Sequence, residues 1–570
     1  MTTLYPLPRS PYPRPGTRVY SNVVLAQGIT RPLTPLGRDA LKLVAAGGAR
    51  IVGFDVPDVR LGPPAYAEAG QRPFGDITAA LRNPAGRRIA QFVLGYMEAR
   101  SAQALSALDA HRDEWPDLAP PTGRRAAALG VARALGRMVR IYAVSRLPLH
   151  AAQAIVDPDA AVRAVDARVA AARGALALPA EVTASERLDA VEHELSARAP
   201  VIMPGVAGYA LPGFVTLGVA SRLLRGRAAP GALQAVLRGL PHNVTTQMDL
   251  ELWDLSRRVG ADPQLRDLDA FLDQWGDRAV TELDLGMPRW REEPEHLLGA
   301  LRNYARVDAG RTDPRALFER GRQEAEQAQS ELLALARGAV EHAVLRFALD
   351  RTRRLVGLRE SPKLTLITTL ARAREQLLAI GADLASAGVL PGRDDVFFCD
   401  VITLRDAIEH GGEPVVGDRV RAVVAANRAE YDAELRRRHI PRMLLSDGTE
   451  VETLAPALPG DGRSLTGTPA SAGTVTARAR VITDPAGAHL EPGEILVAPS
   501  TDPGWTPLFL TAGGLVMEMG GSNSHGAVVA RECGIPAVVG VRDAASTLVT
   551  GQLITVDGGA GVVRLGDEPR

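Results

Sequence analysis

The fold of the C-terminal part of the chain is decided by residues 520–540, which read GGSNSHGAVVARECGIPAVVG. This segment predicts a helix over residues 525–533, because it carries alanines and no proline. Ser524 is a favourable N-cap whose hydroxyl is expected to accept from backbone N–H groups of the first turn. Gly534 suits the left-handed position after a helix, and the proline that follows prevents continuation. His525 is therefore expected in the first helical turn.

The position of His525 favours phosphorylation of its ring. The start of a helix carries unpaired N–H groups and the positive end of the helix dipole, so added negative charge is stabilised there. Imidazole is largely neutral near pH 7 and offers a ring nitrogen as a nucleophile. Glycines at 520, 521 and 526 leave room for a phosphoryl group and its donor. The alternative is a histidine that only begins a helix.

This pattern resembles the phosphohistidine motif of the mobile domain in phosphoenolpyruvate-utilising enzymes. The family pattern is Gly-Gly, two variable residues, Ser-His, small residues, Ala-Arg and then Gly-Ile-Pro-Ala-Val-Val-Gly. One departure is Gly526, where the family usually has Ala, which we interpret as a mild loosening of the turn. The resemblance implies that His525 is catalytic. It places these residues in the loop around the phosphohistidine: Gly520, Gly521, Ser524, Arg531, Thr501 and Asp502.

From residue 464 onward, short apolar runs predict strands, at 473–482, 494–499, 515–519, 537–539, 553–557 and 562–565. With the helix that begins at His525, these strands are typical of a small α/β domain. We assign residues 465–566 to a swivelling phosphohistidine domain and 567–570 to a tail. Residues 455–464, rich in proline and glycine, are expected to be the linker on which it turns.

Composition excludes several classes of protein. Lys+Arg and Asp+Glu are equal at 66 each, and aromatic residues make up only 4%. Neither nucleic acid nor a membrane surface is an expected partner. Residues 200–220 carry no charge but contain Pro204, Pro212 and several glycines, so we expect a buried helix–turn–helix rather than a membrane span. The N-terminus has no signal-peptide pattern, which favours the cytoplasm.

Residues 21–454 predict a large, mainly α-helical domain that binds the acceptor. Apolar residues recur at helical spacing in most of it, and Gln323–Arg354 predicts one long helix. Residues 1–20 are rich in proline and predict an extended leader. Thr34-Pro35-Leu36 resembles an element early in the acceptor domain of rifampin phosphotransferases.

Two segments of this domain suggest a pocket. In residues 237–255, a polar turn containing His242 precedes an amphipathic helix, and it either lines a pocket or caps the helix. Residues 271–303 resemble a run in the acceptor domain of rifampin phosphotransferases, with Asp277 where the family usually has His. Within this run, Arg278, Glu282 and Asp284 form either a structural ion-pair cluster or part of the acceptor site.

Arg359 and Lys363 form a basic pair, four residues apart at a helix entrance. Arg offers a planar fork and Lys a point charge, which together suit phosphate oxygens. Rifampin phosphotransferases have a similarly spaced pair at the acceptor pocket. Lys363 is also one of only two lysines in a chain whose basic residues are otherwise arginine. The alternative is an exposed helix end.

The layout resembles a rifampin phosphotransferase without its ATP-grasp domain, and no phosphate-binding Gly-Lys-Ser/Thr loop occurs. The resemblance implies a phosphotransferase in which His525 takes the β-phosphoryl group of ATP and passes it to a small-molecule acceptor. ATP and Mg²⁺ are expected on an ATP-grasp protein or domain acting in trans, and none on this chain alone. Two alternatives are a ligase or dehydratase that phosphorylates its substrate to activate it, and a non-enzymatic phosphocarrier.

Overall fold

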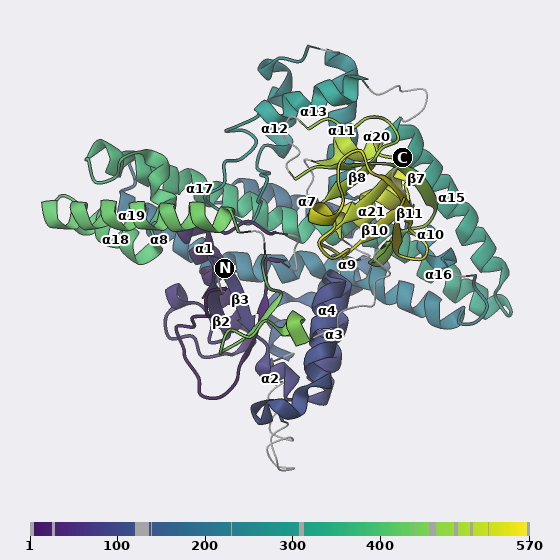
Figure 1. The fold of residues 1–570 in the computed structure, drawn as a ribbon, viewed down its shortest axis with the longest axis horizontal. Helices are drawn as coiled ribbons and strands as arrows, with labels where there is room; N and C mark the ends of the chain where they lie inside the picture. The colour runs from purple at the N-terminus through teal and green to yellow at the C-terminus, as the bar shows by residue number, and fades with distance from the viewer. Residues whose placement is uncertain are drawn as a thin grey trace.

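The computed structural model of the chain describes residues 5–25, 29–119, 136–137, 139–179, 181–229, 231–260, 262–306, 313–437, 439–454, 463–483, 488–501, 505–521 and 524–566. A larger, mainly helical region is followed by a small α/β region, which lies at the right of Figure 1 in yellow. This confirms the two fold classes expected for the two parts of the chain. The predicted tail and residues 455–462 of the predicted linker lie outside the described residues.

The main core of the helical region is built around α17 (Ser361–Ser386). This helix buries residues on most of its circumference, Leu370, Leu377 and Ile380 among them. It packs against α7 (Pro158–Arg173), α8 (Ala184–His193), α9 (Ala199–Leu223) and the short 3₁₀ helix η8 (Arg393–Phe398). Residues of α1 (Pro35–Val52) belong to the same buried cluster. The other longer helices are α3 (Pro84–Met97), α4 (Ala99–Ala110), α6 (Leu147–Val156), α11 (Val244–Val259), α12 (Asp269–Trp275), α13 (Glu295–Arg306), α18 (Val401–His410) and α19 (Pro414–Leu435).

The prediction of a helix–turn–helix over residues 200–220 is wrong, because α9 (Ala199–Leu223) runs unbroken through Pro204 and Pro212. The glycines allow close packing: an ideal Cβ on Gly213 would lie 2.9 Å from the backbone nitrogen of Val356. Residues 184–223 are long and apolar enough to cross a membrane by length and composition, with 44% of their most apolar window buried. Packing against α6 and α16 accounts for that burial.

The predicted long helix over Gln323–Arg354 is wrong as well. It is divided into α15 (Pro314–Ala334) and α16 (Ala339–Val356), and Gly338 between them has a φ of 135°. Apolar residues continue at helical spacing on both sides of the break, so the periodicity does not reveal it. The glycine at a left-handed position is the physical cause of the interruption.

A four-stranded antiparallel sheet, not anticipated from the sequence, joins the two ends of the helical region. Its strand order is β2 (Tyr66–Ala69), β3 (Arg72–Asp76), β1 (Val19–Asn22), β4 (Met443–Leu445). Residues of the proline-rich N-terminal stretch lie against this sheet: Tyr5 is buried and donates its hydroxyl to the carbonyl of Ala69, and Arg9 forms a β-bridge with Glu68.

The α/β region contains an eight-stranded sheet in the order β5-β12-β11-β7-β8-β9-β10-β6, in which β7 to β10 are parallel. Six strands match the predicted runs: β7 (Thr474–Val481), β8 (Ile495–Ala498), β9 (Gly514–Met517), β10 (Ala537–Val539), β11 (Leu553–Asp557) and β12 (Val562–Leu565). The elements not predicted are β5 (Ser464–Thr466), β6 (Thr468–Ser471), α20 (Thr506–Thr511) and α22 (Ala544–Thr547). The predicted helix is confirmed as α21 (His525–Cys533), with Gly534 left-handed after it.

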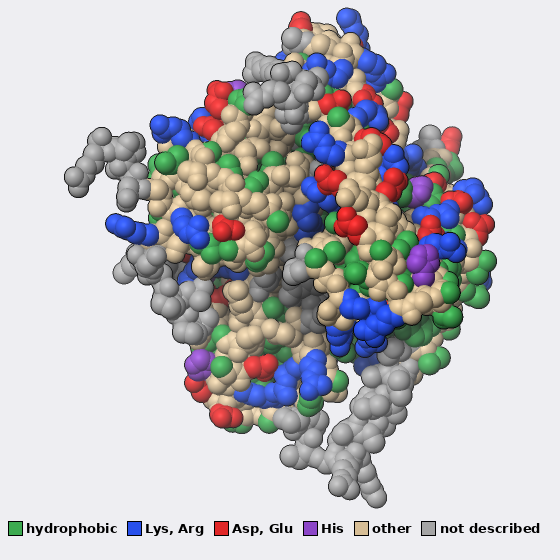
Figure 2. Space-filling view, turned by 90° about the vertical axis from the view of Figure 1, so that its right-hand side faces the viewer, with side chains coloured by type: hydrophobic (Ala, Val, Ile, Leu, Met, Phe, Trp, Pro, Cys, Tyr) green, Lys and Arg blue, Asp and Glu red, His purple; other side chains and the backbone are tan. Residues whose placement is uncertain are grey.

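The two regions pack against each other through helices. α21 lies against α15, and α20 lies against α13. Leu510 of the α/β region is buried in a cluster with Trp253, Tyr304 and Leu364 of the helical region. On the face of the molecule shown in Figure 2, basic and acidic side chains are interspersed over much of the surface.

Candidate active site

The start of α21 has no side-chain cap. Ser524 occupies the N-cap position, as predicted, with φ of −64° and ψ of 160°. Its hydroxyl, however, donates to the carbonyl of Gly521 at 2.9 Å and makes no capping hydrogen bond, so that part of the prediction is wrong. The N–H groups of the first turn therefore remain available to an anion at the position of His525.

The carboxyl ends of three parallel strands meet at this helix start. Thr501 follows β8, Gly520 and Gly521 follow β9, and Gly540 follows β10. An ideal Cβ on Gly540 would lie 3.3 Å from the carbonyl oxygen of Gly520, so the second and third loops are in contact. Ligands of open parallel sheets bind at this edge.

Gly526 is required by close packing. A Cβ there would lie 2.6 Å from Oγ1 of Thr501 and closer still to Sδ of Met517. The interpretation of Gly526 as a looser turn is therefore wrong, because the glycine makes room for two neighbouring side chains. Thr501 itself donates its hydroxyl to Sδ of Met517 at 3.7 Å.

Arg531 lies at the other end of α21. Its guanidinium donates to the carbonyl of Ala470 on β6 at 3.0 Å, and its own carbonyl accepts from Arg238 of the helical region at 3.1 Å. It thus anchors the helix to its surroundings. Asp502 and the side chain of His525 lie outside the described part of the chain.

A second group of predicted residues is brought together at the start of α17. Glu282 lies between two cations: Oε1 accepts from Arg278 at 2.9 Å, and Oε2 is 2.8 Å from Nζ of Lys363. The side chains of Arg278 and Glu282 are 4% and 3% exposed, whereas that of Lys363 is 41% exposed. Of these three side chains, that of Lys363 is therefore the most accessible to a ligand.

Charge pairing determines the protonation of these groups. Burial alone would raise the pKa of Glu282, but Lys363 and Arg278 outweigh it and lower the pKa to about 2. Burial alone would lower the pKa of Lys363, but Glu282 outweighs it and the pKa is raised. Glu282 is therefore a fixed anion that orients two cations and is too weak a base to accept a proton near neutral pH.

Asp284, by contrast, lies away from this cluster. It is fully buried, and its carboxylate accepts from the backbone N–H and the hydroxyl of Thr34 at 2.9 and 2.6 Å and from the N–H of Gly286 at 2.8 Å. Thr34 is the N-cap of α1. Asp284, which was predicted to line a pocket, is thus a structural link between the Thr-Pro-Leu element and the 271–303 run.

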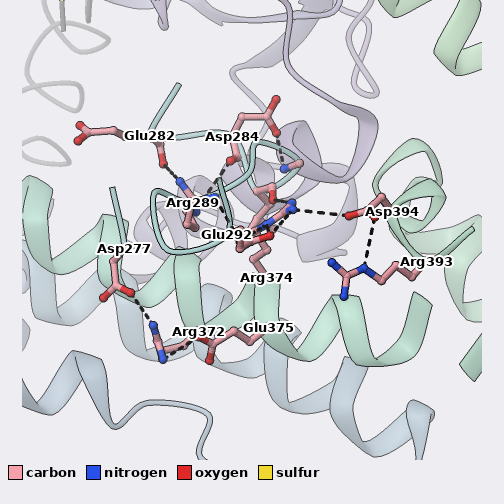
Figure 3. A network of polar contacts seen from close by, with 12 residues as sticks. Asp277, Glu282, Asp284, Arg289, Glu292, Arg372, Arg374, Glu375, Arg393 and Asp394 are labelled. Carbon is pink, nitrogen blue, oxygen red and sulfur yellow. Dashed lines mark hydrogen bonds and ion pairs between the residues drawn. The ribbon is translucent and has the colours of Figure 1, made fainter. Parts of the chain in front are cut away.

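Buried arginines hold the irregular segment 276–294 in place (Figure 3). Arg289 is 1% exposed and donates to the carbonyls of Glu282 and Asp284 at 3.0 and 3.1 Å. Arg374 of α17 donates to the carbonyl of Leu285 at 2.9 Å and pairs with Glu292. These roles were missed from the sequence, although Arg289 lies in the run that carries the resemblance.

Asp277, which replaces the family histidine, forms ion pairs with Arg291 at 2.8 Å and with Arg372 of α17. It is 4% exposed. Asp277 therefore tethers the segment to α17 through these ion pairs.

Arg359 lies within the short helix η7 (Gly357–Glu360) that precedes α17, and the turn that contains His242 contacts the start of η7. Within the described part of the chain, the guanidinium of Arg359 makes a weak contact, 3.3 Å to the neighbouring Glu360. Gly357 touches the backbone of the His242 turn, where His242 has a left-handed φ of 61°. Burial lowers the pKa of His242, and the nearby Asp166 and Asp159 only partly offset this, so its imidazole is neutral at pH 7.

Among the described residues, no three His, Cys, Asp or Glu side chains lie together as they would to hold a metal ion.

Two family models match the chain. Residues 490–561 match the mobile domain of PEP-utilising enzymes, and residues 203–360 match the fourth domain of rifampicin phosphotransferase. Over these residues the chain is similar to PEP-utilising enzymes and to rifampicin phosphotransferases. The mobile-domain match contains α21 and the three strand-end loops, and the second match contains His242, the Arg278–Glu282 pair and Arg359.

Named relatives of the chain include rifampicin phosphotransferases. That of Streptomyces sviceus is 32% identical over 99% of this chain, and that of Bacillus subtilis is 32% identical over 59% of it. The prodigiosin synthesizing transferase of Serratia marcescens is 31% identical over 53% of the chain. The chain spans about 64% of the length of the Streptomyces relative and 41% of that of Bacillus.

Proposed function

We propose that this chain is the acceptor-binding and phosphohistidine part of a phosphotransferase. His525 takes a phosphoryl group from ATP bound to a separate ATP-grasp protein or domain. It then passes the group to a hydroxyl of a small molecule bound beside Arg359 and Lys363. The carrying observation is the uncapped start of α21, which lies where three strand-end loops of a PEP-utilising mobile domain meet.

The relay consists of two displacements at phosphorus. In the first, a ring nitrogen of His525 attacks the phosphoryl group, the bond to the leaving phosphate oxygen breaks, and a P–N bond forms. In the second, the acceptor oxygen attacks the same phosphorus, and the electrons of the broken P–N bond return to the imidazole. Phosphoryl transfer depends mainly on positioning and charge stabilisation, so each site needs to orient only one partner.

The cations at the start of α17 would stabilise the second transfer. Lys363 is held by Glu282 but its side chain is partly exposed, and Arg359 is bound only weakly by its neighbour. Both can therefore turn to phosphate oxygens without leaving a buried carboxylate unpaired, since Arg278 still neutralises Glu282. Stabilisation of this kind is aimed at charge that develops in the transition state.

His242 is the best proton acceptor for the acceptor hydroxyl. Its imidazole is neutral at pH 7, whereas Glu282 is too weak a base and both oxygens of Asp284 are occupied. His242 also has a backbone conformation that is unfavourable for a residue with a side chain, a feature often found at functional sites. The proton would pass from the acceptor oxygen to the free ring nitrogen as the P–O bond forms.

ATP and Mg²⁺ belong to the partner in this proposal. When bound there, they supply an activated phosphoryl group with its charge partly neutralised. The mobile domain would carry the phosphate between the partner and the helical region on the predicted 455–464 linker. The 570 residues supply the carrier histidine, the basic pair and the proton acceptor.

A chemical phosphoryl donor tests the proposal without the partner. Phosphoramidate transfers its phosphoryl group to an imidazole nitrogen and releases ammonia. After labelling, rifampicin is added as a trial acceptor because of the relatives' names, and phosphate on His525 and on the acceptor is followed by mass spectrometry. We expect labelling in the wild type and in Lys363→Ala, with onward transfer slowed roughly 100-fold in the variant.

Two controls make this test specific. Lys42→Ala removes the other lysine, which pairs with Asp39 and Glu68 far from the site, and it should transfer normally. His525→Asn should not be labelled. If Lys363→Ala is folded but unlabelled, the assignment of Lys363 to the second transfer is wrong. If His525→Asn turns over substrate like the wild type, the relay itself is wrong.

A second candidate function is a synthase that phosphorylates its substrate only to activate it. The similarity to a prodigiosin synthesizing transferase favours it. A phosphorylated acceptor would then appear and disappear as product forms. A non-enzymatic phosphocarrier would instead keep the label on His525 in the presence of every acceptor tried.

A further inference from the structure

Arg100, in the first turn of α4, lies at the seam between the helical region and the mobile domain. An ideal Cβ on Gly540 would lie 3.8 Å from Cγ of Arg100 and 3.3 Å from the carbonyl oxygen of Gly520. An ideal Cβ on Gly520 would in turn lie 2.6 Å from Oγ of Ser524, the residue before His525. Arg100 therefore approaches the loops that precede His525 from the side of the helical region.

The guanidinium of Arg100 has no counter-ion. Among the residues that the structure describes, none forms a hydrogen bond or ion pair with it. The charged groups around it are Arg442, Glu98, Asp543, Arg542 and, across the seam, Glu518. Burial and then Arg442 lower the pKa of Arg100 to about 10, so the group stays charged at pH 7.

The neighbouring carboxylate of Glu98 is committed through one oxygen, and its Oε1 is buried without a hydrogen-bond partner among the described residues. Oε2 of Glu98 accepts from Nε of Arg442 at 3.0 Å and from the backbone N–H and hydroxyl of Ser101, each at 2.7 Å. Arg442 also donates to Sδ of Met519 at 3.2 Å, just before Gly520. Arg442 thus ties the helical region to the loop, while Arg100 beside it is attracted by Glu98 and Asp543 but forms no direct ion pair with a described residue.

A partly buried guanidinium without an anion is unfavourable unless an anion arrives. We propose that Arg100 is a positioning residue that binds the phosphoryl group on His525 while the mobile domain is docked. This inference rests on the proposed function, since it requires phosphorylated His525. Arg100 would hold the phosphate from the side of α4, and the acceptor would approach from Arg359 and Lys363.

The test measures the phosphoryl group itself and not turnover. The full chain is phosphorylated with phosphoramidate, the modified residue is mapped by mass spectrometry, and the phosphoryl group is titrated by ³¹P NMR. A nearby cation favours the dianion, so the phosphoryl group should titrate at a lower pH in the wild type than in Arg100→Gln. The expected difference is on the order of 1 pH unit. Arg100→Lys should retain part of it.

Arg542→Gln is the matched control, because Arg542 lies at the same seam but is 71% exposed and pairs with Asp543. It should titrate like the wild type. Equal titration of the wild type and Arg100→Gln, with His525 labelled in both, would overturn the inference and leave the proposed function standing. The inference would also be overturned if Arg100→Lys and Arg100→Gln lost thermal stability equally and both lost the whole difference in titration pH, because that result would indicate a structural role. No labelling of wild-type His525 would overturn both.

Discussion

Close packing makes some glycines necessary, whereas other glycines have room for a side chain. An ideal Cβ on Gly526 would contact Thr501 and Met517, whereas an ideal Cβ on Gly48 of α1 would have nothing within 4 Å. Both residues lie inside helices, so helix propensity alone would favour alanine at either position. The surrounding atoms therefore decide whether replacing the glycine with alanine raises or lowers stability.

We expect Gly526→Ala to lower the free energy of unfolding by about 1–3 kcal/mol, as overpacking does. Gly48→Ala should raise it by up to about 1 kcal/mol. Urea unfolding of both variants measures this. Shortening Met517 in Met517→Val should lessen the cost of Gly526→Ala, so the double variant should be more stable than the sum of the two changes predicts. Strict additivity would contradict the contact.

The segment between α12 and α13 shows how an element without regular structure is held. Residues 276–294 are mostly buried but form only turns, so many of their carbonyls lack strand or helix partners. Side chains supply them: Arg289 and Arg374 donate to three of these carbonyls, and Glu282 and Asp277 pair with cations of α17. Since buried backbone groups must be paired, these ion pairs maintain the fold of the pocket wall.

Glu282 makes this element sensitive to acid. Its pKa is about 2 in the folded chain and near 4.5 when unfolded, so the pairing contributes about 3 kcal/mol above pH 4.5. This contribution is lost as the pH falls from about 4.5 to 2. We expect Glu282→Gln to be less stable than the wild type by a similar amount at pH 7 and by much less at pH 2.5. Urea unfolding at both values measures the difference.

Glu331→Gln, on the exposed face of α15, is the control and should follow the wild type at both pH values. If Glu282→Gln and the wild type lose stability in parallel between pH 5 and pH 2, Glu282 is not the group responsible. Lys363 determines how the pairing responds to alkaline pH. Because its pKa is raised in the folded chain, its contribution to the free energy of unfolding is complete below its unfolded pKa and is lost only at strongly alkaline pH.

Local signals predicted the elements of the mobile domain well, because turn residues and apolar runs determine them. The helix at 525–533 and strands such as 553–557 fall where the sequence places them. The break at 335–338 was missed because apolar residues continue at helical spacing on both sides of Gly338, and the unbroken α9 was missed because tertiary packing overrides what its glycines and prolines signal locally. The four-stranded sheet was missed because β1 pairs with β4, more than 400 residues later in the chain.

The candidate site shows the same limit. The resemblance identified Arg278, Glu282 and Lys363 singly, but their meeting depends on the fold that brings the segment to α17. Asp284 also carries a carboxylate and lies two positions from Glu282, yet it faces Thr34. Arg100 carried no sequence signal, because only the docking of the two regions places it beside Gly540.

At the scale of the whole molecule, two helix contacts join the α/β region to the helical region, in addition to the bond from Arg442 to Met519. At one, Arg238 donates to the carbonyl of Arg531 at the end of α21 and pairs with Glu324 of α15. At the other, α20 lies against α13, and its Leu510 is buried among helical-region side chains. A domain that carries phosphate between two sites must break these contacts together.

Arg238→Ala tests whether the domain moves as a unit. Loss of one hydrogen bond of about 1 kcal/mol should make undocking roughly fivefold more frequent. If the domain leaves whole, hydrogen exchange should accelerate by the same factor at the end of α21 and at the α20 contact, although Arg238 touches only the first. Arg322→Ala, which removes ion pairs confined to α15, should change neither. Acceleration at α21 alone would mean that the helix end frays locally and that the domain does not swing.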